Sequence, residues 1–483
     1  MSESLSVSDR THKRRWIILI LINIVIFMST LDSSIVNVAL PTMADQLGVG
    51  SGIIAWVITI YLIAIAAVIL VFGRLGDIFG QTKIFNIGIL VFTIGSALCG
   101  LSHTLPMLLL ARVIQAIGAG ATMGNNQGII TRVFPPSERG RALGFAGTSV
   151  ALGTLAGPAL GGLIVSVTSW EYIFWINIPI GIVAFILCLR ELPKRAVRKQ
   201  ESLDIKGSLL FFLTVVPLFF AMNQIQIWGV SDFRVRLCLA LSIISFLMFL
   251  SVEKKSSTPL LDLTIFKNKW FTVSIICAFL SYIVLFSSAI LQPFYLQNVR
   301  GLSPGTAGLL MCVMPLVMAI AAPLSGHLSD KVGSEILTLT GLIVTLGGVL
   351  LMATLTQNTS LIIMSIFVAI LSLGNANFQS PNTSLTMSSV TRDKLGIGGS
   401  VNALARNFGM VCGITLSTSL LYGGMSQKLG THVTAYSAGQ ENAFIYGMRL
   451  AYLAAAVICA IAIIITAVRL HGRKIKAAPA KVQ

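Results

Sequence analysis

Asp32 is a carboxylate inside a long apolar run, and its position is the first sign of chemistry in the sequence. It belongs to the stretch LDSSIVNVALP at 31–41 and precedes Pro41 by nine residues, roughly 13 Å along a helix. An ionised carboxylate at that depth costs at least a few kcal/mol, and such residues usually face a bundle interior and mark proton paths. We therefore predict that Asp32 binds a proton. The alternative, an aspartate at a helix end near the outer membrane surface, would lie less deep.

Arg112 is the candidate partner of Asp32. A predicted helix enters the membrane near Leu105, and Arg112 lies seven residues further, roughly 10 Å inward and at a depth similar to that of Asp32. Opposite charges at one depth offset each other's burial. Two interpretations stay open. One is a static ion pair that fixes helix packing; the other is a carboxylate that holds a proton in one state and is ionised by arginine or a cationic substrate in another.

Arg406 is the third charge within an apolar run, eight residues or about 12 Å from Gly398. No acidic residue lies inside the predicted spans of the second half of the chain. Arg406 could pair with the other half, bind anionic groups, or extend toward the membrane surface. We consider it a candidate for coupling or gating.

The segments that must position these charges are long and apolar. The chain has 483 residues, of which 55% are hydrophobic and 11% charged, and its mean hydropathy is +0.87; soluble domains carry about 25% charged residues. Runs of about 20 apolar residues cross a hydrocarbon core of about 30 Å as helices, and they lack the alternation of barrel strands. The first run is too long for a cleaved signal peptide. We predict an all-α polytopic membrane protein with fourteen spans, at 16–40, 52–72, 84–101, 105–130, 142–167, 172–189, 207–226, 235–252, 271–295, 305–325, 336–355, 361–381, 398–422 and 446–470.

The net charge of +17 is distributed as in a membrane protein and does not indicate binding to a nucleic acid. With the N-terminus inside, 27 of the 34 basic residues lie in or beside cytoplasmic segments, four lie outside and three lie within or at the edge of spans. This asymmetry is typical of the positive-inside rule and predicts two cytoplasmic termini in a multi-pass cell membrane protein. The seven cysteines are scattered singly and the five histidines lie in loops and tails, so we expect no metal, disulfide or haem site.

The loops are too short to contain a catalytic domain, so we expect no enzyme. GRLGDIFGQTK at 73–83 and GHLSDKVGSE at 326–335 share the pattern Gly-x-Leu-x-Asp-x-x-Gly after the second span of each half. Two repeats around an axis along the membrane normal are a transporter layout, with the substrate site near the midplane between them. We predict a cytoplasmic tail at 1–15, a six-helix half at 16–190, two inserted helices with flanking cytoplasmic loops at 191–269, a second six-helix half at 270–470, and a basic tail at 471–483.

The sequence resembles the major facilitator superfamily, and within it the fourteen-helix drug:proton antiporters of the multidrug efflux type. The helix-five segment is the most specific match, since that motif is associated with exporters rather than symporters. Gln81, Thr82, Ala116 and Glu171 depart from the family pattern. The resemblance rests on LDSSIVNVALP, on GRLGDIFGQTK, on ARVIQAIGAGA at 111–121, on GFAGTSVALGTLAGPALGG at 144–162 and on FWINIPIG at 174–181.

The resemblance implies proton coupling through Asp32 and Arg112, and a cytoplasmic gate latched by Arg74, Asp77 and Gly80, with Asp330 as the counterpart in the second half. From its position alone, Asp77 could also cap the third helix. The glycines of the fifth span could serve close helix packing or allow a bend at Gly157-Pro158. The motif residues of that span are Gly144, Gly153, Gly157, Pro158, Gly161 and Gly162.

The predicted pocket is apolar and aromatic with neutral polar groups, and most of these groups could equally bond between helices. The candidates are Asn37, Tyr61, Gln115, Asn125, Asn126, Tyr282, Gln292, Asn375 and Asn377.

The chain lacks a Gly-x-x-x-x-Gly-Lys-Ser/Thr loop, so we expect a proton gradient rather than ATP to drive it, without a cofactor. The predicted function is proton-coupled export of amphipathic, often cationic, compounds by alternating access. We expect a monomer that binds small molecules, protons and the lipid bilayer, and no nucleic acid. Three alternatives remain: a dedicated exporter of one metabolite, lipid or peptide product; a passive channel or a receptor; and a proton symporter for uptake, against which the helix-five pattern counts.

Overall fold

The apolar segments form helices because, in hydrocarbon, only a helix satisfies each backbone donor and acceptor within its own segment. The computed structural model describes residues 14–135, 138–193, 204–229, 231–256, 259–390, 395–433 and 435–477. Within these ranges every regular element is helical, and 14 helical spans are long and apolar enough to cross a membrane. The predicted fold class and the predicted number of spans are therefore confirmed.

The first span is longer than its apolar run. Helix α2 (Arg15–Leu47) continues through Pro41, seven residues beyond the predicted end at residue 40. Proline removes a single backbone donor, and the residues after it form two further turns. Gly48 then ends the helix in the left-handed conformation, with φ of 63°, and its N–H donates to the carbonyls of Ala44 and Asp45.

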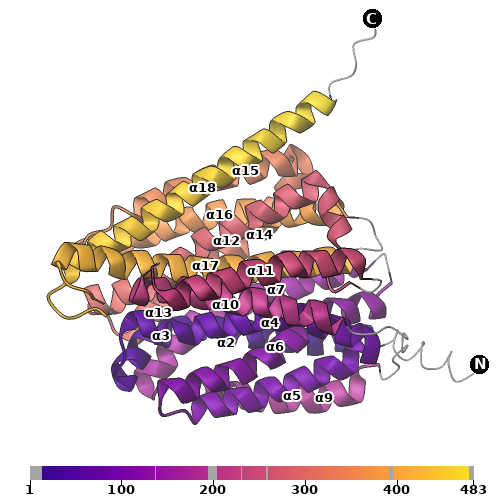
Figure 1. Ribbon diagram of the computed structural model, residues 1–483, viewed down its shortest axis with the longest axis horizontal. Coiled ribbons are helices and arrows are strands. Elements are labelled where there is room, and N and C mark those ends of the chain that lie inside the picture. The colour runs from indigo at the N-terminus through magenta and orange to yellow at the C-terminus, as the bar shows by residue number, and fades with distance from the viewer. Residues whose placement is uncertain are drawn as a thin grey trace, which may run out of the picture. The chain divides into compact units, whose positions relative to one another are not determined.

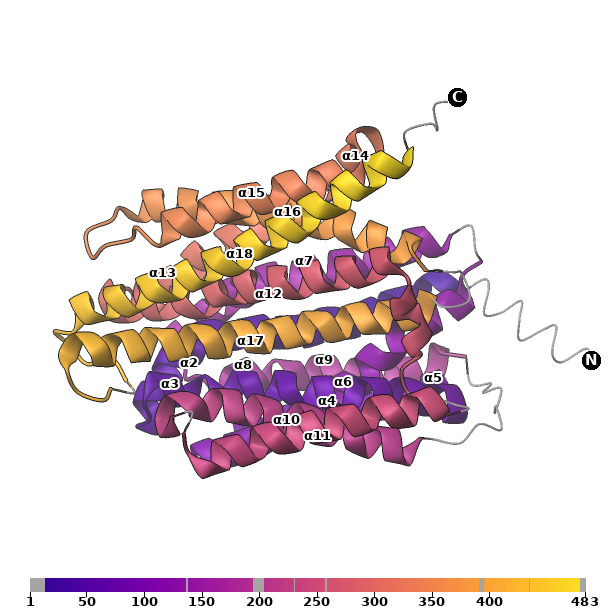
Figure 2. The same cartoon turned by 45° about the horizontal axis from the view of Figure 1, so that its top comes forward.

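The chain divides into two compact units. Unit 1 comprises Met1–Asp262 and Leu302–Leu309. Within it α2 packs on α7, α6 packs on both α4 and α5, and α10 and α11 lie side by side (Figures 1 and 2), with α10 against α4. The two inserted helices thus belong to the first unit. Besides α2, the helices of this unit are α3 (Ser51–Ile54), α4 (Trp56–Phe79), α5 (Gln81–Gly100), α6 (Leu105–Val133), α7 (Arg139–Val167), α8 (Tyr172–Trp175), α9 (Asn177–Glu191), α10 (Ile205–Trp228) and α11 (Phe233–Lys255).

Unit 2 comprises Leu263–Gly301 and Leu310–Gln483, so α13 (Pro304–Met311) begins in unit 1 and ends in unit 2. Helix α15 lies beside both α16 and α18, and α12 lies beside α17 (Figures 1 and 2). The helices of this unit are η1 (Leu263–Lys267), α12 (Lys269–Phe294), η2 (Tyr295–Val299), α14 (Val313–Val332), α15 (Ser334–Met352), α16 (Leu361–Ser388), α17 (Leu395–Leu429) and α18 (Glu441–Ala477).

The internal repeat is visible in the backbone. Gly80 separates α4 from α5 with φ of 101°, and Gly333 separates α14 from α15 with φ of 99°. Both conformations favour glycine, which explains the last position of the shared Gly-x-Leu-x-Asp-x-x-Gly pattern. A Cβ atom on Gly95 of α5 would lie 2.5 Å from the backbone of α6, and one on Gly348 of α15 would lie 2.6 Å from the backbone of α16. Each unit therefore contains an equivalent close contact between two of its own helices, in addition to the common sequence motif.

Candidate functional site

Asp32 and Arg112 form an ion pair in the interior of unit 1. Arg112 Nη1 on α6 lies 2.7 Å from Asp32 Oδ2 on α2, and both side chains have a relative exposure of 0%. The two charges that were expected at matching depth are thus in direct contact. Such a buried pair is tolerated only where the geometry is good and the remaining polar atoms find partners.

Two amide side chains complete the coordination of the carboxylate. Gln115 Nε2 and Asn177 Nδ2 each donate to Asp32 Oδ1 at 2.8 Å. Asn177 also donates to Ser96 Oγ at 3.1 Å, and all three of these side chains are fully buried. An ionised carboxylate only accepts hydrogen bonds, so three donors on its two oxygens match the charged form. We call Asp32, Arg112, Gln115, Asn177 and Ser96 the Asp32 cluster.

Arg112 has further contacts that do not involve the carboxylate. Its Nε donates to the Val57 carbonyl at 3.1 Å, and its Nη1 also donates to Gln115 Oε1 at 2.7 Å. The guanidinium carbon lies 4.1 Å from the centre of the Tyr61 ring and 5.6 Å from that of Phe174, which are cation–π distances. The guanidinium would therefore keep hydrogen bonds and aromatic contacts if the carboxylate became neutral.

Close helix contacts bring the cluster together. Gly95 lets α5 approach the backbone of Gln115, and the α7 glycines let that helix approach α2 next to Asp32. A Cβ atom on Gly153 would lie 2.9 Å from the Phe27 carbonyl, and one on Gly157 would overlap Ser34, whose hydroxyl donates to the Gly153 carbonyl at 3.0 Å. These contacts agree with the close-packing interpretation of the helix-five motif.

The rest of that motif extends the same packing. Helix α7 continues without interruption through Pro158. A Cβ atom on Gly161 would lie 2.9 Å from the Ile35 carbonyl, and one on Gly162 would lie 2.6 Å from the carbonyl of Pro304 in the first turn of α13. Gly144 also lies in α7, but its surroundings are outside the described part of the chain.

The residues predicted to latch a cytoplasmic gate lie near the C-terminal ends of α4 and α14, and one expectation about them is wrong. Asp77 does not cap the third helix, because α4 extends to Phe79 and Gly80 occupies the capping position of α5. Its Oδ1 instead accepts from Gln81 Nε2 at 3.2 Å. Arg74 lies in the same last turns of α4. Asp330 lies in α14, and its side chain is outside the described part of the structure.

The neutral pocket candidates fall into three groups. Gln115 belongs to the Asp32 cluster, and the Tyr61 ring contacts Arg112 of that cluster. Tyr282 and Asn375 are joined through Gln379 in unit 2, and Gln292 Nε2 donates to Ser288 Oγ at 2.9 Å. The remaining candidates are Asn125, which donates to the carbonyls of Phe72 and Ala121, and the half-buried Asn37, Asn126 and Asn377.

Three buried polar positions escaped the sequence reasoning. Asn177 and Ser96 belong to the Asp32 cluster, although the only available signal was a polar residue inside an apolar run. Arg469 is one of the 27 basic residues predicted to lie in or beside cytoplasmic segments, but its side chain is 4% exposed. It donates to Ser274 Oγ at 3.0 Å and to Thr338 Oγ1 at 2.7 Å, which ties α18 to α12 and α15.

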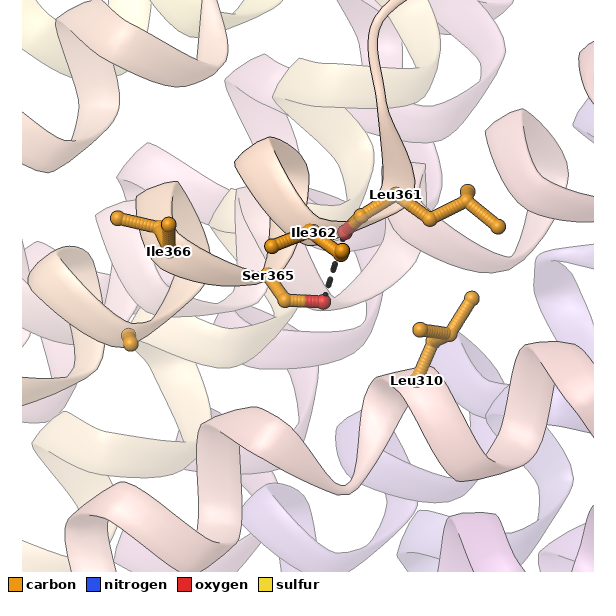
Figure 3. A pocket seen from close by; sticks show the side chains of 6 residues that line it. Leu310, Leu361, Ile362, Ser365 and Ile366 are labelled. Carbon is orange, nitrogen blue, oxygen red and sulfur yellow. Dashed lines mark hydrogen bonds between the residues drawn. The ribbon is translucent and has the colours of Figure 1, made fainter.

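An apolar groove of about 310 Å³ lies on unit 2, between Leu310 and the first turns of α16 (Figure 3). Its lining includes Leu361, Ile362 and Ile366. The Ser365 hydroxyl in this groove already donates to the Leu361 carbonyl at 2.9 Å. The lining therefore offers no free polar group that could fix the orientation of a ligand.

Comparisons with known proteins agree with this architecture. The family model described as Major Facilitator Superfamily matches residues 22–414 and 274–482. A riboflavin transporter of Clostridioides difficile is 38% identical over 94% of this chain and 97% of its own length. A multidrug transporter protein of Bacillus subtilis is 31% identical over 85% of this chain and 76% of its own length. Both of these relatives are transporters by name.

Solved structures share the fold at low sequence identity. A bacterial homologue of the human lysosomal transporter Spinster, in an inward-facing conformation, has a TM-score of 0.64 at 16% identity and covers 94% of this chain and 96% of its own. A POT family transporter in complex with 5-aminolevulinic acid has a TM-score of 0.68 at 17% identity and covers 94% and 95%. With the fourteen spans, the repeated glycine pattern and the family match, these findings show that the chain is a multi-pass transporter protein that belongs to the Major Facilitator Superfamily.

Proposed function

We propose that this protein is a proton-coupled exporter of amphipathic compounds that works by alternating access in the cell membrane. The observation that supports the proposal is Asp32, a fully buried carboxylate in a membrane span that is held by one cation and two amides. Intramembrane carboxylates of this kind mark proton paths. One charge moved through about 100 mV releases about 2.3 kcal/mol, so a proton gradient can drive the cycle without ATP or a cofactor.

The cluster indicates how a proton would act. A proton on Asp32 removes the charge that attracts Arg112, while the guanidinium keeps the Val57 carbonyl, Gln115 Oε1 and the Tyr61 ring. The neutral acid also carries an O–H donor, which opposes whichever donor faces that oxygen: Arg112 at Oδ2, or Gln115 and Asn177 at Oδ1. Protonation therefore changes the contact of α2 with α6 in either case, and that with α9 if the proton lies on Oδ1, which can bias one conformation over another.

A dedicated exporter of one metabolite is the second candidate. It is favoured by the similarity to a riboflavin transporter, at 38% identity over nearly the whole chain, whereas the named multidrug relatives are 30–31% identical. Both candidates use the same fold and the same Asp32 cluster. They differ in the range of compounds that move.

Uptake into everted membrane vesicles tests both candidates. Vesicles that contain the wild type, Asp32→Asn or Asp45→Asn are energised to an acid interior and given riboflavin, ethidium and fluorescein in turn. Asp45 is the matched control, because it undergoes the same chemical change at the exposed end of the same helix. We expect uphill uptake by the wild type and Asp45→Asn, abolished by a protonophore, and at least a tenfold loss with Asp32→Asn.

The pattern of compounds separates the candidates. Uptake of several unrelated compounds indicates a multidrug exporter, and uptake of riboflavin alone indicates a dedicated one. Uptake that persists unchanged after the protonophore has collapsed the gradient would contradict proton coupling. Equal rates for Asp32→Asn and Asp45→Asn would show that the proton binds elsewhere.

A further inference from the structure

We propose that the cargo binds to a donor surface on unit 2, formed by Tyr282, Asn375, Gln379, Asn402 and Arg406, and that it is rich in hydrogen-bond acceptors and carries no positive charge. This inference rests on the proposed export function and names the chemistry of its cargo. It differs from the cationic cargo that the sequence alone suggested.

A chain of hydrogen bonds crosses this surface from Tyr282 through Gln379 and ends at the amide of Asn375. The Tyr282 hydroxyl of α12 donates to Gln379 Oε1 of α16 at 2.8 Å, and Gln379 Nε2 donates to Asn375 Oδ1 at 2.8 Å. The acceptor oxygens of both amides are thus used. Asn375 Nδ2 has no hydrogen-bond partner among the described residues, although the side chain is 0% exposed. A buried donor without a partner is unfavourable, and an acceptor on a ligand would satisfy it.

Arg406 adds a positive charge to the same surface. It lies half-buried on α17, close enough to Tyr282 for an electrostatic interaction, and its Nε is buried with no hydrogen-bond partner among the described residues. In the described part of the chain Arg406 forms no ion pair. A cationic ligand would be repelled here, whereas a carboxylate, phenolate or carbonyl oxygen would be attracted.

The other intramembrane charge does not reverse this preference. Asp32 already accepts from Arg112, Gln115 and Asn177 with full burial. A cationic cargo would have to displace an arginine from that carboxylate, which would leave Arg112 buried without its counter-ion. The charged side chains thus favour cargo without positive charge.

The donor surface is partly accessible, although Asn375 itself is buried. Gln379, Asn402 and Arg406 are all partly exposed. A small cavity of about 10 Å³, the space of one water, lies beside Tyr282 and Asn402. Asn375 and Gln379 lie four residues apart on one face of α16, so their side chains are presented together. The surface therefore combines a charged donor, neutral donors and an aromatic ring from three helices.

Equilibrium binding to the purified full-length protein in detergent tests the proposal without any gradient. Fluorescein serves as an anionic probe, riboflavin as an uncharged probe rich in acceptors, and ethidium as a cationic probe. We expect the wild type to bind fluorescein and riboflavin more tightly than ethidium. Arg406→Gln should weaken fluorescein binding at least tenfold, and Asn375→Leu should weaken riboflavin binding several-fold.

Three variants serve as controls. Arg234→Gln removes the same charge from an exposed side chain of unit 1 that pairs with Asp232, and should leave binding unchanged. Arg406→Lys keeps the charge and should retain part of the fluorescein affinity. If Arg406→Gln fails to give a monodisperse protein, Arg406→Lys and Asn375→Ser provide the comparison.

Tighter binding of ethidium than of both other probes, or equal affinities in Arg406→Gln and Arg234→Gln, would overturn the proposal. A lack of binding by both acceptor-rich probes would also overturn it. Binding that depends on Arg406 would support the proposed cargo class. Vesicle uptake that is independent of the proton gradient would, at the same time, contradict proton coupling. The two proposals can therefore fail separately.

Discussion

At the residue scale, three buried donors hold one carboxylate. Arg112 contacts Oδ2 of Asp32, and Gln115 and Asn177 share Oδ1. A buried pair of this kind contributes little net stability, but removing one member leaves an uncompensated charge. The cluster is therefore sensitive to any change in the charge of Asp32, which is the property that proton coupling requires.

Arg112→Met tests this sensitivity. We expect the variant to lose about 3–5 kcal/mol of unfolding free energy, because Asp32 would stay buried without its counter-ion. The double variant Asp32→Asn/Arg112→Met should recover much of that loss, since no charge remains. Thermal and denaturant unfolding in detergent measure both values. A double variant that is as unstable as the sum of the two single variants would contradict the coupling.

Asn177→Ala tests the amide that sequence reasoning missed. Hydrogen bonds to charged groups contribute about 1.5–3 kcal/mol, so we expect a loss of stability in that range together with slower uptake into everted vesicles. Asn126→Ala, at a half-buried amide of α6, is the control and should lie near the wild type in unfolding experiments. Equal behaviour of the two variants would remove Asn177 from the account.

Counting residues along the helices is enough to place Asp32 and Arg112 at one depth from the sequence alone. The same count does not reveal Asn177 or Ser96, because their contribution depends on the rotation of α9 and α5 about their own axes. That rotation is set by packing, including the hydrogen bond from Ser96 to the Phe174 carbonyl. Neutral polar residues in apolar spans are also common, so the sequence alone offers no way to rank them.

At the element scale, α7 acts as a closely packed support for α2. Its glycines face the backbone of α2 over the turns that hold Asp32, at Gly153, Gly157 and Gly161. Such contacts allow two helices to approach closely where larger side chains would separate them. A shift of α7 would therefore move Asp32 relative to Arg112.

Gly153→Ala and Gly147→Ala form a matched pair on this helix. A Cβ atom on Gly153 would lie 2.9 Å from the Phe27 carbonyl, whereas one on Gly147 would meet nothing within 4 Å. We expect Gly153→Ala to cost about 1–3 kcal/mol through overpacking, and Gly147→Ala to be neutral or stabilising by up to about 1 kcal/mol. The midpoints of unfolding in detergent, compared between the two variants and the wild type, measure both effects. Equal midpoints would show that α7 and α2 separate easily.

The helices themselves were largely predictable, because most apolar runs are bounded by polar, glycine or proline residues. The ends were less so. Pro41 suggested the end of the first helix, yet α2 continues to Leu47. Proline removes only one backbone donor, which is not enough to end this helix. Asp77 similarly suggested a helix cap from its residue type and its place between two apolar runs. Because α4 extends to Phe79, Asp77 lies inside that helix instead.

At the scale of the whole molecule, the two units share a fold but differ in chemistry. Gly409 of α17 approaches the Phe279 carbonyl of α12 just as Gly153 of α7 approaches the Phe27 carbonyl of α2. By this correspondence, the place of Asp32 is taken in unit 2 by Val284, a side chain with 1% exposure. Unit 2 carries Arg406 and its amides instead. The repeat was predictable from one glycine pattern, but the grouping of the two inserted helices with unit 1 was not, because it depends on tertiary contacts.

Alkaline phosphatase fusions test the orientation of the whole chain. The enrichment of basic residues on one side predicts two cytoplasmic termini. A fusion after Gln483 should therefore be inactive, and one inserted in the loop after Gly430 should be active. A β-galactosidase fusion at each site is the reciprocal control. Phosphatase activity at Gln483 would show that the chain has the opposite orientation, and would reverse the proposed direction of transport.

Proton movement in reconstituted liposomes is the most direct test of the claim that Asp32 couples protons to cargo. A pH-sensitive dye is sealed inside, and a gradient is imposed of whichever probe the wild type takes up fastest in everted vesicles. We predict that the wild type and Asp45→Asn move protons against the flow of the probe, and that Asp32→Asn moves none above protein-free liposomes. Proton movement by Asp32→Asn at the rate of the wild type would contradict the account.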